Sequence, residues 1–394
     1  MQNVSSSNSE KALVPKLRFP EFTGEYSSVQ LGKIANKVVR NDPNSNAPIM
    51  MISAASGFIN QSIKYSRENA GKSLKKYTLL KQGELAYNHG ASKLRTFGCC
   101  FELEEKEARI PYVYHTFSIN EKQYTHYIAK YLNNPLIDKQ LKKLVTSSVR
   151  MDGLLNISYN EYMGIRLNIP NYSEQEKVSK FLTLIDKKIQ LQQQLIENLK
   201  LYKRGVLHRI FNKEFKSKTF TEWKEKSLKS VFHLARDYVL PVSEISVVKT
   251  SEYQYPVYSS QTKNDGLLGY YNQYLFEDAI TWTTDGANAG YTRFRKGKFY
   301  CTNVCGVLIS NDNQANEYIA ERINYVTKKH VSYVGNPKLM NNVMAEIKID
   351  FPEISEQQYY SKFIEKLNIK LYNFESQFDV LEKLKTGILQ QMFI

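Results

Sequence analysis

The chain has 394 residues and a formal charge of +15, from 54 Lys and Arg against 39 Asp and Glu, so it exceeds one ordinary domain and two or more cores are expected. Hydrophobic residues make up 42% and aromatic residues 12%, which excludes a disordered protein. Four cysteines exclude a secreted disulfide framework, and the sequence has no run of 18 apolar residues, so we expect a cytoplasmic protein.

The chain begins with a segment that we predict to be a flexible tail. Residues 1–15 are rich in Ser and Asn and lack the apolar centre of a signal peptide. Residues 16–171 follow, and their short apolar runs between Gly, Asn and Asp predict a first globular domain, a mixed sheet with helices.

A long helix is predicted over 172–212. Residues 165–170 alternate apolar and polar side chains as a half-buried strand does, and Pro170 marks the exit from that strand. Ser173 stands three residues before Glu176, which is the spacing of a capping box and predicts a helix start. Apolar residues then recur every seven positions, and the predicted helix seam contains Val178, Ile185, Leu199 and Val206.

The same design returns 182 residues further along the chain. Residues 213–352 are predicted to form a second domain, with strands at 279–283 and 305–309, and 353–394 to form a second long helix. Its predicted seam contains Leu367, Phe374, Leu381 and Ile388. The sequence therefore predicts an α+β fold with an internal, pseudo-twofold repeat.

Each predicted helix has about 40 residues and would be roughly 60 Å long. A single heptad helix would favour dimerisation of two chains through a coiled coil. Two matching helices in one chain favour pairing inside the monomer, and antiparallel pairing would set the two domains at opposite ends.

The positive charge is spread unevenly over these parts. The first domain carries +9 and its helix +4, whereas the second domain carries +3 and the last helix −1. Loops near 88–95, 259–264 and 284–295 mix cations with Asn, Gln, Ser and Tyr, which suits phosphate contacts and base readout, although a solvated surface has the same composition. The candidate DNA-binding residues are Lys72, Lys75, Asn88, His89, Ser92, Lys93, Arg95, Arg150, Ser260, Gln261, Lys263, Asn264, Asp285, Asn288, Thr292, Arg293, Arg295, Asn303 and Lys338.

Catalytic signatures are missing from the sequence. The Gly71-Lys72-Ser73 run lacks the glycine five positions earlier that a phosphate loop needs. The cysteines lack the spacing of zinc ligands, so we expect buried apolar residues, and the six His are scattered without a nearby nucleophile. We therefore predict no catalytic residue and no metal site in this chain.

The order of variable domain, long helix, variable domain and long helix resembles the specificity subunit of type I restriction-modification systems. The resemblance rests on the opening segment 17–22, the segments 169–175 and 351–357 that lead into the helices, and the helix ends 203–207 and 385–389. It covers nearly the whole chain. One departure is that 215–220 does not copy 17–22.

The resemblance implies a subunit without catalysis of its own, in which each domain is a target recognition domain that reads one half of a split double-stranded DNA site. The paired helices, which the family conserves, would set the unread spacer and dock two modification subunits. Those subunits would carry S-adenosylmethionine, and restriction subunits joined through them would use ATP and Mg, so this chain would bind no cofactor. Two other hypotheses stay open: a coiled-coil adaptor without DNA specificity, and an enzyme with an unrecognised site.

Overall fold

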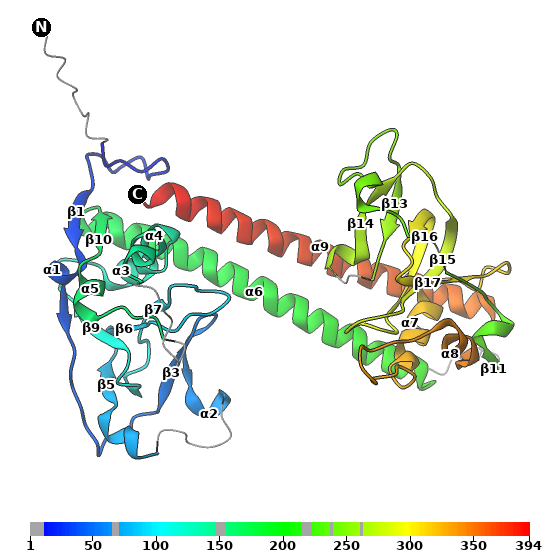
Figure 1. The fold of residues 1–394 in the computed structure, drawn as a ribbon, viewed down its shortest axis with the longest axis horizontal. Coiled ribbons are helices and arrows are strands. Elements are labelled where there is room, and N and C mark those ends of the chain that lie inside the picture. Colours follow the sequence, from blue (N-terminus) through cyan, green and yellow to red (C-terminus); the bar gives the residue numbers. More distant parts are fainter. Residues whose placement is uncertain (1–11, 65–70, 146–153, 215–221, 237–238, 261–262) are drawn as a thin grey trace, which may run out of the picture. The chain divides into compact units, whose positions relative to one another are not determined.

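The computed structural model describes residues 12–64, 71–145, 154–214, 222–236, 239–260 and 263–394. The chain divides into two units (Figure 1). Unit 1 contains residues 1–191 and 378–394, and unit 2 contains residues 192–377. The sequence predicted each long helix as a segment separate from the two domains. The two units instead divide each helix between them, because the two halves of a helix pack with different hydrophobic cores.

The main sheet of unit 1 has four antiparallel strands in the order β2-β9-β6-β7 among the described residues. Two further strand pairs of the described residues, β3 with β4 and β5 with β8, form separate two-stranded sheets. The bounds are β2 (Ala35–Lys37), β3 (Met50–Ser53), β4 (Gly57–Asn60), β5 (Thr78–Lys81), β6 (Leu85–Asn88), β7 (Cys99–Glu102), β8 (Glu107–Ile110) and β9 (His115–Ile119).

Helices pack on the sheet of unit 1 and bury its largest side chains. Tyr87 stacks on Tyr162 with ring centroids 3.9 Å apart, and Phe117 lies in the same core. Asn134 caps the helix that starts at Pro135. The helices are α1 (Leu31–Ile34), α2 (Gln61–Lys64), α3 (Thr125–Leu132), α4 (Pro135–Leu144) and α5 (Tyr159–Met163), with the 3₁₀ helix η1 (Gly71–Lys76).

In the described part of unit 2, the sheet has six strands in the order β12-β17-β15-β16-β13-β14. Trp282 is buried at its centre, and its ring occupies the space that a side chain at position 306 would need, so the facing residue is Gly306. The predicted strands at 279–283 and 305–309 are confirmed. The bounds are β12 (His233–Arg236), β13 (Tyr255–Tyr258), β14 (Leu267–Tyr271), β15 (Phe276–Thr283), β16 (Thr292–Cys301) and β17 (Cys305–Ile309).

Helix α7 (Glu317–Thr327) covers this sheet, and α8 (Asn341–Glu346) lies near its end. Three 3₁₀ helices complete the described part of unit 2: η2 (Leu228–Ser230), η3 (Val242–Glu244) and η4 (Lys263–Gly266). The first four strands of its sheet, β12-β17-β15-β16, follow the same order as β2-β9-β6-β7 of unit 1.

Each unit also has a pair of strands that leads into a long helix. Strand β1 (Ser27–Gln30) pairs with β10 (Arg166–Ile169) before α6 (Tyr172–Phe211), and β11 (Lys224–Ser227) pairs with β18 (Lys348–Phe351) before α9 (Ile354–Met392). Strands β10 and β18 and both helices were predicted. The predicted capping box at Ser173 is wrong, because α6 starts before this residue, and the Asn171 side chain accepts from the Glu174 amide.

Matching contacts hold the start of the long helix in both units. Gln175 Nε2 donates to the Pro170 carbonyl at 2.8 Å, and Gln357 Nε2 donates to the Pro352 carbonyl at 2.9 Å. Tyr26 Oη and Trp223 Nε1 donate to the buried glutamates at the two helix starts, Glu174 and Glu356. In unit 1 the Arg18 guanidinium also binds Glu174, at 2.8 and 2.7 Å.

Within each unit, one half of α6 lies beside one half of α9 (Figure 1). In unit 1 Asp186 pairs with Lys385 at 2.8 Å, and in unit 2 Lys200 pairs with Glu375 at 2.6 Å. The predicted seam residues are buried or half-buried. A second row of apolar residues lies on α6 four residues after the seam positions and is buried more deeply. It contains Leu182, Ile189 and Ile196.

The carboxyl ends of both helices enter a globular core. Phe211 contacts the rings of Tyr318 and Tyr325 in unit 2. Phe393 contacts Tyr127 and Tyr131 in unit 1, and Tyr131 Oη donates to the carbonyl of Ile394.

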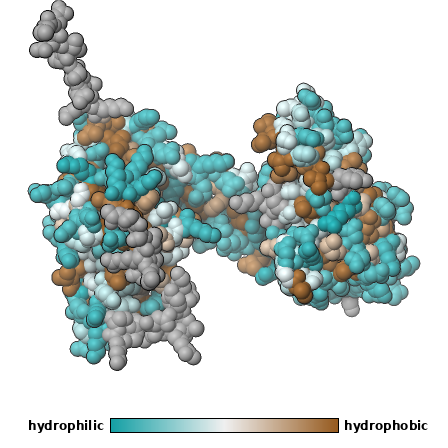
Figure 2. Space-filling view, in the orientation of Figure 1, coloured by the Kyte–Doolittle hydropathy of each residue, from teal (hydrophilic) through white to brown (hydrophobic). Residues whose placement is uncertain are grey.

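The surface is mostly hydrophilic, with apolar patches over the part of unit 2 that carries β13 and β14 (Figure 2). Exposed apolar residues in that region include Val242, Val247 and Val248. Among the described residues, none of the helices combines the length and apolarity of a membrane span.

Candidate nucleic-acid interface

A polar cluster surrounds the turn that joins β15 to β16 in unit 2. The Arg236 guanidinium lies 3.5 Å from the Asp285 carboxylate and donates to the Asn303 carbonyl at 3.0 Å. Lys338 Nζ lies 3.8 Å from Asp285 on the other side. The fold therefore brings together three predicted residues, Asp285, Asn303 and Lys338, with Asn288 exposed in the same turn.

The turn that joins β6 to β7 in unit 1 carries a second set of predicted residues. Ser92 and Arg95 close a tight turn through the bond from the Ser92 amide to the Arg95 carbonyl. Arg95 Nη1 donates to the Asn133 carbonyl at 2.6 Å, so its guanidinium is partly engaged. Lys93 is exposed at this turn, and the Asn88 side chain accepts from the Gly90 amide.

These two turns occupy equivalent places in their sheets. The Leu155 amide donates to the His89 carbonyl at 2.9 Å, and the Leu339 amide donates to the Thr284 carbonyl at 2.8 Å. The next residue in each turn also makes an antiparallel bridge, Gly90 with Leu154 and Asp285 with Lys338. The sequence did not reveal this correspondence, since the two turns share no motif.

Three of the predicted DNA-binding residues are buried, which contradicts their predicted role, whereas Arg293 is half-buried. His89 is 5% exposed, and its two ring nitrogens bond the carbonyls of Leu155 and Val113, so it stabilises the fold. Thr292 is 3% exposed and donates to the Ala320 carbonyl. Arg293 and Arg295 lie in strand β16 and both pair with the Asp265 carboxylate, and Arg295 is 6% exposed over the Tyr258 ring.

The remaining candidates fall into two groups. Lys75 and Asn264 are exposed and Ser260 is half-buried, away from the two turns in sequence. Arg150, Gln261 and the side chains of Lys72 and Lys263 lie outside the described residues.

Sequence reasoning missed several exposed basic residues of unit 2. Arg236 binds the central Asp285, and Lys328, Lys329 and His330 follow α7 and precede the segment that returns to Lys338. The signal was present as a Lys-Lys-His run without any nearby acid. It was hidden because the run is distant in sequence from the turn at 284–291.

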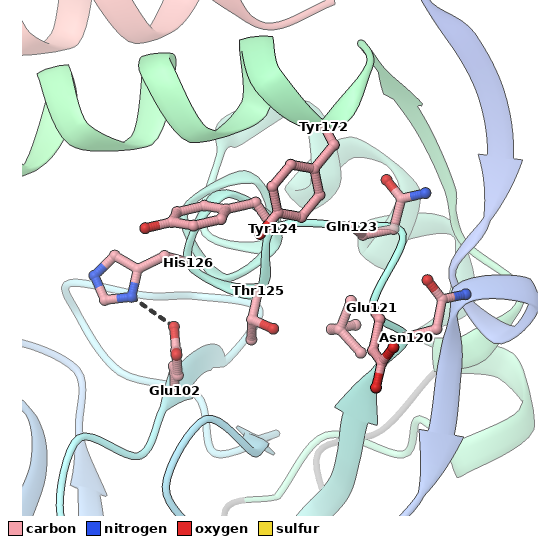
Figure 3. A pocket seen from close by; sticks show the side chains of 9 residues that line it. Glu102, Asn120, Glu121, Gln123, Tyr124, Thr125, His126 and Tyr172 are labelled. Atoms are coloured by element: carbon pink, nitrogen blue, oxygen red, sulfur yellow. Dashed lines mark hydrogen bonds and ion pairs between the residues drawn. The ribbon is translucent and has the colours of Figure 1, made fainter.

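Unit 1 has a hollow of about 400 Å³ next to the start of α6. Tyr124, Tyr172 and His126 line it, and the His126 ring points toward Glu102, with Nδ1 2.6 Å from Oε2 (Figure 3). The hydrogen bond with Glu102 raises the pKa of His126. Since two carboxylates and neither Lys nor Arg line this hollow, its charge disfavours a phosphate.

The chemistry of the described side chains gives no metal or thiol site. The described residues contain no group of three His, Cys, Asp or Glu that could hold a metal ion. All four cysteines are buried and free, as predicted, and burial raises the pKa of Cys99 to about 11.

Comparison with known families identifies unit 2. The family model of the type I restriction modification DNA specificity domain matches residues 221–377. The chain carries a type I DNA specificity domain. This domain contains the β15–β16 turn, Arg236 and the Lys338 segment, and the resemblance predicted from the sequence is confirmed.

Chains similar to this one come from Mycoplasma pneumoniae. The specificity subunit of the type I restriction enzyme MpnII is 39% identical over 106 residues, which cover 26% of this chain and 32% of the relative. Another chain named as a type I specificity subunit is 28% identical over 214 residues, which cover 52% of this chain and 75% of the relative. Three others match at 38–41% identity, and the chain spans only 34%, 57% and 36% of their lengths.

Solved structures share the fold. The S subunit of a type I restriction-modification system from M. genitalium superposes with a TM-score of 0.63 at 14% identity, over 96% of this chain and 99% of that chain. A chain from a study of complex assembly and conformational transition in the type I system gives a TM-score of 0.50 at 12% identity, over 93% and 97% of the two chains. The mixed α and β architecture is therefore that of type I specificity subunits.

Proposed function

We propose that this chain is the DNA-binding specificity subunit of a type I restriction-modification complex. The observation that carries the proposal is the placement of the polar turn 284–291 inside the matched specificity domain, with an equivalent turn in unit 1. Each unit reads one half of a bipartite double-stranded DNA site. Exposed Lys and Arg hold phosphates, and polar groups at the turns read base edges.

The two helices act as a ruler in this proposal. The contacts of α6 with α9 in unit 1 and in unit 2 support one antiparallel coiled coil, and the matching contacts at the helix starts support a pseudo-twofold repeat. A helix of 40 residues spans roughly 60 Å, more than one turn of DNA at about 34 Å. The helix pair sets the length of the unread spacer.

Catalysis belongs to other chains in this proposal. Two modification subunits dock on the helices and carry S-adenosylmethionine, and restriction subunits joined through them use ATP and Mg. The exposed apolar residues on the outer faces of the helices, such as Leu184, Leu191, Tyr372 and Val380, suit such docking.

Genome-wide methyladenine mapping in the host tests the proposed function. Deletion of the gene is expected to remove methylation at one split motif, and restoring the gene is expected to return it. A complex purified through a tag on the full chain is expected to bind that motif with an affinity that falls steeply with salt. An unchanged methylation map together with salt-independent or absent DNA binding would favour the adaptor hypothesis.

A further inference from the structure

We propose that Tyr333 and Val334 make the apolar contact with bases in the half-site that unit 2 reads. They lie at the tip of a short loop, residues 332–338, which we call the tip hairpin. The proposal rests on the proposed function and names residues of that same site.

Backbone bonds close the tip hairpin. The Ser332 amide donates to the Lys338 carbonyl and the Lys338 amide to the Ser332 carbonyl, both at 2.9 Å. Gly335 adopts a φ of +74°, which an L side chain rarely adopts, so the loop turns sharply there. The hairpin therefore presents its tip in one defined conformation.

The base of the tip hairpin is fixed to the specificity-domain turn. The Gly286 amide donates to the Pro337 carbonyl at 2.9 Å, which ties the hairpin to the turn that carries Asp285. Val331 and Leu339, on either side of the hairpin, are buried, and both would touch a side chain at Gly290. The tip hairpin is therefore held against the turn at 284–291.

The two apolar side chains at the tip are left outside the core. Tyr333 is 68% exposed and Val334 is 91% exposed, although their neighbours Val331 and Leu339 are buried. Burial in unit 2 does not account for an aromatic and a β-branched residue at these positions. Contact with a ligand accounts for them, because burying exposed apolar groups against a ligand lowers their free energy.

The charge around the tip selects a nucleic acid as that ligand. Residues 328–338 contain Lys328, Lys329, His330 and Lys338 and no acidic residue. Arg236 and Lys338 share the single carboxylate of Asp285, so these three side chains together keep one net positive charge beside the tip. Cations that flank an apolar tip match a duplex, in which phosphates flank the apolar thymine methyl groups and base faces.

The test replaces the apolar groups and measures specificity. A double variant, Tyr333→Ser with Val334→Ser, is expected to lower affinity for the methylated motif by about tenfold and to relax one or two base positions of one half-site. The slope of affinity against salt is expected to stay unchanged. A matched control, Lys328→Ala with Lys329→Ala, is expected to weaken binding to all sequences and to reduce that slope.

Two arms identify the apolar partner. Uracil in place of each thymine removes the methyl group and retains the pairing, so a loss in wild type that is absent in Val334→Ser indicates a methyl contact. Fluorescence of 2-aminopurine that rises on binding by wild type and not by Tyr333→Ser indicates an unstacked base. If the double variant loses thermal stability, Val334→Thr replaces it, because threonine keeps the shape of the valine side chain. This variant is expected to show the same loss of affinity for the motif.

Unchanged affinity and unchanged motif in the serine and threonine variants would overturn the inference and leave the proposed function intact. Failure of the wild-type complex to bind any split motif would instead overturn the proposed function. The binding measurements use the complex purified through a tag on the full chain, and the motif comes from methyladenine mapping.

Discussion

Buried ionic groups at single residues fix the start of the first helix. The Glu174 side chain is fully buried and accepts from Arg18 and Tyr26. Arg18→Ala leaves this carboxylate without its cation, and we expect the free energy of unfolding to fall by about 3 kcal/mol. Denaturant unfolding of the full chain measures it.

The matched control is Lys180→Ala, which removes an exposed ion pair with Glu176 on the same helix. We expect little or no change in the unfolding midpoint for this control. A similar loss in both variants would contradict the role assigned to Arg18.

Stability is also expected to depend on pH through Glu317, the first residue of α7. Burial, and then the charge of Glu321, raises the pKa of Glu317 from 4.5 to about 7, although Lys203 and Arg293 lower it and Glu365 raises it further. The folded state therefore binds a proton more tightly than the unfolded state. Its contribution to stability is present below pH 4.5 and is lost as pH rises to about 7.

Glu317→Gln removes this dependence. We expect the variant to exceed the wild type in stability at about pH 8 by about 1–3 kcal/mol and to differ little near pH 4. Thermal unfolding across this pH range, with Glu382→Gln on the exposed face of α9 as control, measures the effect. Equal curves for wild type and Glu317→Gln would show that the carboxyl does not titrate as stated.

At this scale the sequence predicted residue types better than residue roles. Arginine is a residue type that often reads bases, yet Arg295 pairs with Asp265, which lies 30 positions earlier in the sequence. Only the folded sheet brings these two side chains together. His89 is likewise held by carbonyls 24 and 66 residues away. Local sequence contains no information about such partners, so exposure could not be predicted.

The helices were the most predictable elements. Their heptad spacing, together with the strand exits before them, predicted both helices to within two residues at the ends, because the seam pattern persists over the whole length. Their caps were missed, since Asn171 competes with Ser173 for the same role. Strand pairing in the domains could not be predicted, because paired strands, like the residue contacts above, are distant in sequence.

One polar seam residue provides a test of helix pairing. Gln192 Nε2 donates to the Phe374 carbonyl at 2.9 Å in an otherwise apolar row. Gln192→Leu is expected to raise the unfolding midpoint of the full chain and to permit altered pairing, seen as oligomers by light scattering.

The comparison variant is Gln193→Leu, whose side chain is exposed one position further along α6. It is expected to leave the midpoint and the mass nearly unchanged. A lower midpoint for Gln192→Leu would contradict a seam position for this residue.

At the scale of the whole molecule, corresponding contacts in the two units, which the sequence did not predict, support the proposed repeat. Equivalent turns follow β6 and β15, and equivalent aromatic residues lie at the carboxyl ends of the two helices, Phe211 as the last residue of α6 and Phe393 directly after α9. The positive charge is larger on the first half, so the first unit is expected to contribute more phosphate affinity.

The most direct test of the account changes the ruler and leaves the reading units untouched. One heptad inserted after Leu191 and one after Gln377 preserve the seam, since Gln192 faces Gln377 across the pair. Each insertion adds about 10 Å, or about three base pairs at roughly 3.4 Å each. Methyladenine mapping in the host is predicted to show both half-sites unchanged and the spacer longer by about three base pairs. An unchanged spacer, or altered half-sites, would contradict the account.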